Sequence, residues 1–126
     1  MVNILLVEDE EDLLRLIQKY FEKNGLYVRA YTSPLLALEE FMKNTHDNGY
    51  DLVISDFRMP EMNGIELATL IRKMNKYIPI ILMTAYDALD IDPFILKFLN
   101  IDDIITKPIR LRTFIEKIKL NKKLKY

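Results

Sequence analysis

The stretch Asp51-Leu52-Val53-Ile54-Ser55-Asp56-Phe57-Arg58-Met59-Pro60-Glu61-Met62-Asn63-Gly64 decides the fold of this chain. It begins with an apolar, β-branched run that ends abruptly in the carboxylate of Asp56. A loop containing Pro60 and Gly64 follows, and a helical pattern begins after it. This order predicts a buried strand with Asp56 at its carboxyl end, which is where open α/β sheets carry their sites.

Four further apolar runs alternate with helical patterns on either side of this stretch. The five expected strands are residues 3–7, 27–31, 51–55, 79–83 and 102–106. Five strand–helix alternations with short connections predict an α/β fold, a doubly wound five-stranded parallel sheet with helices on both faces. A flavodoxin-like strand order of 2-1-3-4-5 would place the first and third strands side by side.

Three local expectations concern the helices and the chain end. The helix that begins at Pro34 is expected to bury Leu35, Leu38, Phe41 and Met42. Residues 87–100 are expected to be helical, with Pro93 near the start or between two pieces. One domain is expected over residues 1–120, followed by a basic, frayed tail over residues 121–126.

Composition limits the classes of function. The chain has 126 residues, a formal net charge of −1 and no cysteine, which excludes disulfide scaffolds, thiolate zinc sites and cysteine nucleophiles. No apolar stretch reaches membrane-spanning length and the start runs straight into a strand, so a cytoplasmic protein without membrane contact is expected.

The end of the sequence is basic. From Lys107 onward there are eight Lys or Arg residues and a single acidic residue, Glu116. This basic end fits a solvated helix end or the stub of a DNA-binding module, but no helix-turn-helix is present, so no direct DNA binding is predicted.

Polar groups follow four of the five predicted strands. Glu8 and Asp9 follow the first, Asp56 the third, Thr84 the fourth and Lys107 the fifth. In a parallel sheet all of these ends lie on one edge. Clustered carboxylates repel one another by roughly 4 kcal/mol per pair at 4 Å, so they need a cation, and oxygen ligands favour Mg²⁺. A divalent ion, a lysine and a hydroxyl together would receive a phosphoryl group, which a carboxylate can accept as an acyl phosphate.

Four sequence blocks resemble the receiver domain of the two-component response regulators. They are Ile4-Leu5-Leu6-Val7-Glu8-Asp9-Glu10, the block from Asp56 to Gly64, Pro79-Ile80-Ile81-Leu82-Met83-Thr84-Ala85, and Asp102-Asp103-Ile104-Ile105-Thr106-Lys107-Pro108. One block alone would be weak evidence, but four in this order and spacing are highly specific. The resemblance covers the chain from Asn3 to about Leu120.

The resemblance implies a metal site and a phosphoacceptor. Asp56 would accept the phosphoryl group from the phosphohistidine of a sensor histidine kinase or of a phosphotransfer protein. Asp9, Asp56 and the backbone carbonyl of Arg58 would bind Mg²⁺ directly, with Mn²⁺ as a substitute. Glu8 would reach the ion through water.

The resemblance also implies how the phosphorylated state is read. Thr84 would hydrogen-bond the phosphate, Lys107 would pair with it, and the Lys107–Pro108 peptide bond would be cis. The family usually has Tyr or Phe at the position of Ile104, so the aromatic half of the usual switch is absent. A separate hypothesis comes from position: Arg58 and Tyr86 stand two residues beyond Asp56 and Thr84, near an attacking water, so their bulk would slow hydrolysis of the aspartyl phosphate.

Several alternatives stay open at this level. The chain encodes no recognisable output domain, so the expected output is binding to an unknown downstream protein or a phosphorylation-linked homodimer. Phe94 and Phe98 are candidates for that surface, although a helical apolar stripe more often packs in the core. A Mg²⁺-dependent phosphohydrolase with Asp56 as its nucleophile is the alternative function, although Arg58 stands where such enzymes carry a second acid. A scaffold that has kept the fold without phosphorylation is the third.

Overall fold

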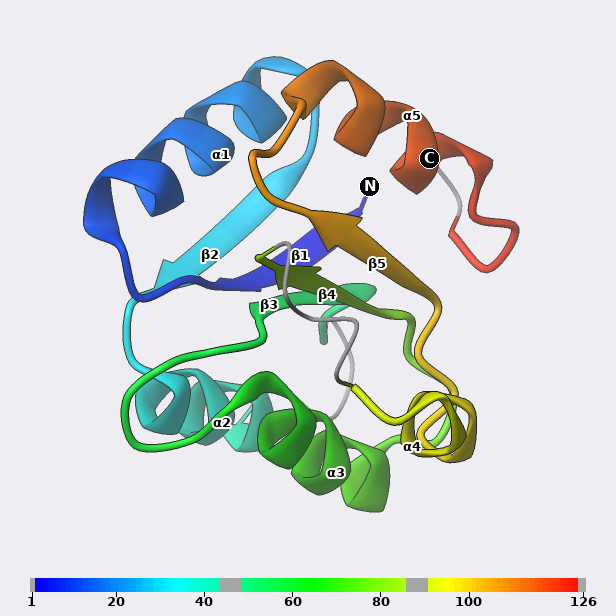
Figure 1. Cartoon of the computed structure of the whole chain (residues 1–126). Helices are drawn as coiled ribbons and strands as arrows, with labels where there is room; N and C mark the ends of the chain where they lie inside the picture. Colours follow the sequence, from blue (N-terminus) through cyan, green and yellow to red (C-terminus); the bar gives the residue numbers. More distant parts are fainter. Residues whose placement is uncertain (1, 44–48, 86–90, 125–126) are drawn as a thin grey trace.

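Strands and helices alternate from the start of the chain to its last helix (Figure 1). The structure is a computed structural model that describes residues 2–43, 49–85 and 91–124. The elements are β1 (Asn3–Val7), α1 (Glu11–Lys23), β2 (Tyr27–Tyr31), α2 (Pro34–Lys43), β3 (Leu52–Asp56), α3 (Gly64–Met74), β4 (Ile80–Thr84), α4 (Pro93–Phe98), β5 (Asp103–Thr106) and α5 (Leu111–Leu120).

All five strands pair in parallel in the order β2-β1-β3-β4-β5, which confirms the predicted fold class and strand order. The order reverses between β1 and β3, because the chain first moves to one side of β1 and then crosses to the other. Ligand sites of doubly wound sheets lie at such a reversal, outside the carboxyl ends of the strands. The register brings the ends level, since Val7 pairs with Ser55 and Thr84 pairs with Thr106.

Two apolar layers hold the helices on the sheet, α1 and α5 on one face and α2, α3 and α4 on the other (Figure 1). Alternate residues of β1 pack into the two layers. Ile4 and Leu6 face α1 and α5, whereas Leu5 and Val7 face the layer of α2, α3 and α4. The central strands are therefore buried on both faces, which is why they read as continuous apolar runs.

The expected apolar face of α2 is partly wrong. Pro34, Ala37 and Phe41 are the buried residues of this helix, whereas Leu35 and Met42 are 45% and 58% exposed. Positions 34, 37 and 41 follow the spacing of one helical face, and the small side chain of Ala37 lets the helix approach the sheet.

The helix before β5 is shorter than expected. It covers only Pro93–Phe98, because the side chain of Asp92 caps it at the amide of Phe94 (2.9 Å) and Asn100 ends it with a left-handed φ of 55°. The part of the expectation that falls on residues 87–90 lies outside the described residues. Phe94 and Phe98 are 74% and 80% exposed, so they do not belong to the core.

The chain beyond α5 was expected to be frayed, but it packs against the domain up to residue 124. Leu124 is only 9% exposed and joins the apolar layer beneath α1 and α5. Lys123 forms an ion pair with Asp102 at 2.9 Å. No helix among the described residues is long and apolar enough to cross a membrane.

Candidate functional site

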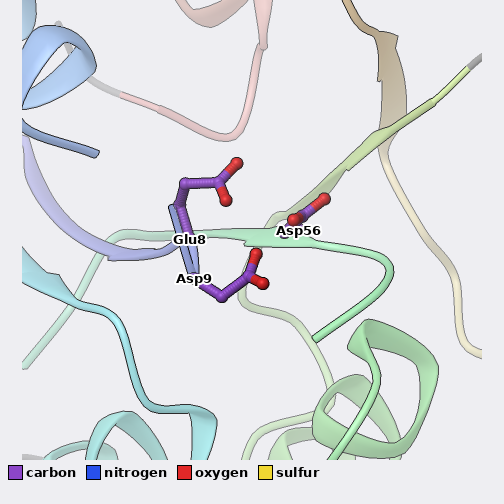
Figure 2. A group of neighbouring side chains, drawn as sticks. All are labelled: Glu8, Asp9 and Asp56. Carbon is purple, nitrogen blue, oxygen red and sulfur yellow. The ribbon is translucent and has the colours of Figure 1, made fainter. Parts of the chain in front are cut away.

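The predicted edge of the sheet brings the polar strand ends together. Glu8 follows β1, Asp56 is the last residue of β3, Thr84 ends β4, and Lys107 follows β5. Figure 2 shows the carboxyl groups of Glu8, Asp9 and Asp56 gathered between the ends of β1 and β3. The sheet therefore assembles groups from four strands at one place.

The three acids form a compact cluster. One carboxylate oxygen from each of Glu8, Asp9 and Asp56 lies within 4.8 Å of the other two. Glu8 is fully buried and Asp56 is 5% exposed, whereas Asp9 is exposed to solvent. Burial strengthens the repulsion between like charges, so this cluster attracts a cation. An all-oxygen donor set of this kind suits a hard divalent ion.

Lys107 supplies one positive charge at the cluster. Its Nζ lies 2.7 Å from Glu8 Oε1 and 3.2 Å from Asp56 Oδ2. Its backbone N–H donates to the carbonyl of Thr84 at 2.7 Å, and the Lys107–Pro108 peptide bond is cis, as predicted. Burial lowers the pKa of Lys107, but contacts with Glu8 and Asp56 outweigh it and raise the pKa above 10.5. The lysine therefore stays charged at neutral pH.

The direct contact between Glu8 and Lys107 was not anticipated. The Glu8 side chain is anchored from both sides, since its Oε2 accepts a hydrogen bond from the backbone N–H of Glu10 at 2.9 Å. The two partners are 99 residues apart in the chain. Their separate strand-end positions were the only signal for this pair in the sequence.

The environment of Asp56 opposes its ionisation. Burial and the nearby charge of Glu8 raise the pKa of Asp56 from 3.8 to about 7, and Lys107 only partly counteracts them. A cation at the cluster would favour the ionised form. Strongly perturbed carboxyl groups of this kind are typical of functional sites.

The raised pKa predicts that Asp56 destabilises the metal-free fold at neutral and alkaline pH. The folded chain holds the Asp56 proton more tightly than the unfolded chain does, so this group makes stability fall as pH rises from about 4 to about 7. We expect Asp56→Asn, which removes the charge, to raise the free energy of unfolding by about 1–2 kcal/mol at pH 8, with a smaller gain at pH 5. Urea unfolding in EDTA measures this difference.

The matched control for the stability measurement is Glu116→Gln, which changes an exposed carboxylate to an amide. Its effect should stay within about 0.5 kcal/mol. A gain from Asp56→Asn that is absent at pH 8, or that is larger at pH 5 than at pH 8, would contradict the prediction.

The loop after Asp56 is held against the start of α3. The side chain of Asn63 accepts from the N–H of Glu66 (2.8 Å) and the carboxylate of Glu66 accepts from the N–H of Asn63 (3.1 Å), which together form a capping box. A Cβ at Gly64 would lie 2.6 Å from the carbonyl oxygen of Asp56, so only glycine allows this close approach. The capping box was missed, although an Asn followed three residues later by Glu was visible in the sequence.

Three of the remaining predicted residues are described by the structure. Thr84 is 4% exposed, and its hydroxyl donates to the carbonyl of Ala85 at 3.3 Å. Arg58 lies in the loop after β3 with an exposed side chain. Ile104 is half-buried on β5 and lines a groove of about 240 Å³ between β5 and α5. Tyr86, expected near the cluster, lies outside the described residues.

Comparison with known proteins identifies the family. The family model for the response regulator receiver domain matches residues 4–119. The heme response regulator HssR of Staphylococcus epidermidis is 32% identical over 119 residues, covering 94% of this chain and 50% of HssR. The chain spans about half the length of the curated relatives it matches.

Solved structures show the same architecture. A response regulator receiver domain protein from Clostridium thermocellum superposes with a TM-score of 0.86 at 26% identity, covering 94% of this chain and 92% of that one. The response regulator TrrA of Thermotoga maritima, solved in complex with Mg²⁺ and BeF, superposes with a TM-score of 0.80 at 33% identity, covering 94% and 97%. The chain therefore belongs to the receiver domain family of the two-component response regulators.

Proposed function

We propose that Asp56 accepts a phosphoryl group from the phosphohistidine of a sensor histidine kinase or phosphotransfer protein. The observation that carries this proposal is the placement of Asp56. Its buried carboxylate lies with those of Glu8 and Asp9 within 4.8 Å and has the ammonium of Lys107 at 3.2 Å. These groups provide an oxygen nucleophile next to a place for a divalent ion and a fixed positive charge.

Mg²⁺ is the metal that fits this donor set, and Mn²⁺ is a substitute. Asp9, Asp56 and the backbone carbonyl of Arg58 would hold the ion directly, and Glu8 would reach it through water. When bound, the ion neutralises the clustered carboxylates and the charge on the phosphoryl oxygens. The metal found in the related TrrA structure supports this assignment.

Phosphoryl transfer to Asp56 takes place in one displacement step. A carboxylate oxygen of Asp56 attacks phosphorus, the P–N bond to the imidazole breaks, and its electron pair goes to the departing ring nitrogen. Lys107 stabilises the charge that the phosphoryl oxygens carry, and Thr84 donates its hydroxyl to one of them once the group is on Asp56. Phosphorylation replaces the carboxylate charge of Asp56 by a phosphoryl group that carries about −1.5 to −2 charges, which biases the surrounding loops toward a second arrangement.

The output of this switch is binding to a downstream protein or to a second copy of the chain in the cytoplasm, without direct contact to DNA or membrane. Phe94 and Phe98 on α4 support a protein-binding role, because they expose large aromatic surfaces. Sedimentation with and without beryllofluoride separates the two cases. A heavier species in the pure treated protein identifies a homodimer.

Labelling of the wild-type chain with acetyl phosphate tests the proposal. In the presence of Mg²⁺ we expect the intact mass to rise by one phosphoryl group, since the carboxylate cluster then binds its ion and Asp56 can attack. Hydroxylamine should remove the group, because it cleaves acyl phosphates, and EDTA should prevent its addition. Failure to label with Mg²⁺ present, or a label that resists hydroxylamine, would count against an aspartyl phosphate.

A further inference from the structure

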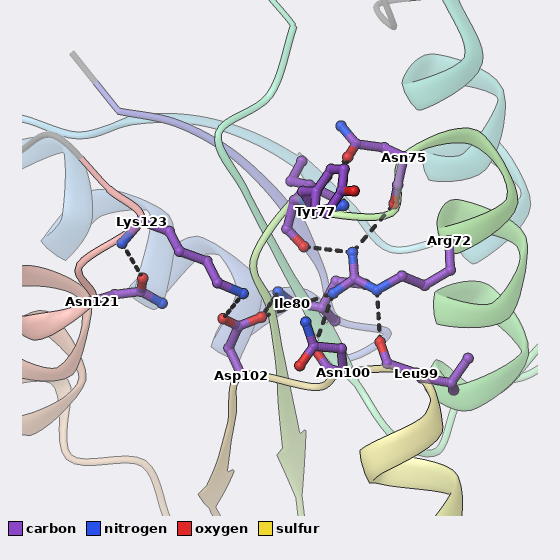
Figure 3. A network of polar contacts seen from close by, with 10 residues as sticks. Arg72, Asn75, Tyr77, Ile80, Leu99, Asn100, Asp102, Asn121 and Lys123 are labelled. Atoms are coloured by element: carbon purple, nitrogen blue, oxygen red, sulfur yellow. Dashed lines mark hydrogen bonds and ion pairs between the residues drawn. The ribbon is translucent and has the colours of Figure 1, made fainter.

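Arg72 ties the end of α4 to α3 (Figure 3). The carbonyls that it holds precede β4 and β5, whereas Asp56 ends β3, so this contact lies at the opposite edge of the sheet. The Arg72 side chain is 10% exposed and lies in the last turn of α3. The guanidinium donates from Nε to the carbonyl of Leu99 at 2.6 Å and from Nη2 to that of Asn100 at 3.0 Å. Nη1 donates to the carbonyls of Ile78 (2.6 Å) and Asn75 (3.3 Å). The last carbonyls after α4 are therefore held by a side chain from another helix.

Asp102 lies between this arginine and the chain end. Its Oδ1 is 3.8 Å from Arg72 Nη2, and its Oδ2 is 2.9 Å from Lys123 Nζ. Two hydrogen bonds of 2.9 Å fix Asp102 to Ile80 of β4, one from each backbone N–H. Neither bond involves a cation, so the position of the carboxylate does not depend on Arg72 or on Lys123.

The segment 121–124 is held by few contacts. The backbone N–H of Lys123 donates to Asn121 Oδ1 at 2.9 Å, and that of Leu124 donates to the Asn121 carbonyl at 3.1 Å. Three contacts join the segment to the rest of the described chain: the backbone N–H of Asn121 donates to the Ile118 carbonyl at 3.2 Å, the Leu124 side chain lies in the core, and Lys123 pairs with Asp102. Segments with so few buried contacts open locally without unfolding the domain. Detachment of segment 121–124 would break only these contacts and leave the sheet intact.

We propose that Arg72 and Lys123 compete for the carboxylate of Asp102, and that this competition couples the C-terminal end of α4 to segment 121–124. Because Asp102 is fixed by Ile80, the coupling is electrostatic: each cation neutralises part of the charge that attracts the other. When the Arg72 side chain moves away from Asp102, together with the Leu99 and Asn100 carbonyls that it holds, Asp102 holds Lys123 more tightly. When segment 121–124 detaches, Asp102 holds Arg72 more tightly, and the two effects are equal in free energy.

Amide hydrogen exchange in a Lys123→Met variant tests the coupling. The substitution removes the charge of Lys123 and leaves Arg72 alone on Asp102. The N–H groups of Leu99, Asn100 and Ile101 donate to carbonyls of α4 and report on its last turn. We expect their exchange, measured by NMR relative to the amides of β1, to slow about two- to threefold, the effect of a partly exposed charge pair.

Two further variants make the test specific. Lys122→Met makes the same change at the neighbouring exposed position and should leave the rates unchanged. Asp102→Asn keeps an oxygen for the Ile80 amide but removes the shared charge, so Lys123→Met should have no effect in that background. Unchanged or faster exchange in Lys123→Met, or equal slowing in the Asp102→Asn background, would overturn the proposal. All samples lack phosphodonor, so the outcome is independent of the proposed phosphoryl chemistry.

Discussion

An Asp56→Asn variant is expected to take up no phosphoryl group from acetyl phosphate under conditions that label the wild-type chain fully. The amide oxygen is a far weaker nucleophile than a carboxylate, and the cluster loses one of its three charged oxygen ligands. We expect the backbone around residue 56 to keep its conformation, because the amide has the same shape as the carboxyl group. Intact-mass measurement before and after incubation with Mg²⁺ reads out the loss directly.

Asp12→Asn is the matched control for this measurement. It makes the same chemical change at an exposed carboxylate in the first turn of α1, outside the cluster. We expect it to label like the wild-type chain. Labelling that persists in Asp56→Asn would move the phosphoacceptor to another residue and remove the basis for the proposed function.

Phe114→Ala is expected to lower the free energy of unfolding by about 3–5 kcal/mol. Phe114 is fully buried on α5 and meets Phe21 of α1 edge to face, with ring centroids 5.1 Å apart and planes at 87°. Truncation leaves a cavity between the two helices that cover one face of the sheet and removes this aromatic contact. Urea unfolding followed by circular dichroism should show a lower midpoint at an unchanged slope.

Phe98→Ala makes the same truncation at a position that is 80% exposed. Because no core is opened there, its effect should stay within about 0.5 kcal/mol. Similar losses from the two variants would mean that the layer under α1 and α5 does not depend on Phe114.

The fold and the place of the site followed from local patterns. Each apolar run was short, β-branched and bounded by turn residues, and parallel pairing then required every carboxyl end to lie on one edge. That rule, together with the expected strand order 2-1-3-4-5, placed Glu8, Asp56 and Lys107 in one region, as the structure has them. It contains no information about side-chain conformation, which is why the ion pair between Glu8 and Lys107 could not be foreseen.

Other features could not be predicted from the local sequence, because they depend on tertiary packing. Leu124 follows α5 without a continuing helical period, so nothing in the local pattern indicated that it enters the core. The helical phase of α2 was misjudged because Leu35 and Met42 are more apolar than Ala37, yet Ala37 faces the sheet. Close packing between helix and sheet selected the small residue over the larger ones.

The wide separation in sequence of the groups around Asp56 has a consequence for quality control. Glu8 and Lys107 are 99 residues apart in the sequence, and β5 is the last strand of this sheet to be synthesised. A nascent or truncated chain that lacks β5 has no Lys107 to place beside Asp56. Under the proposed function, phosphoryl transfer would therefore require that β5 has paired with β4, so an unfinished or misassembled copy would be inactive rather than wrongly active.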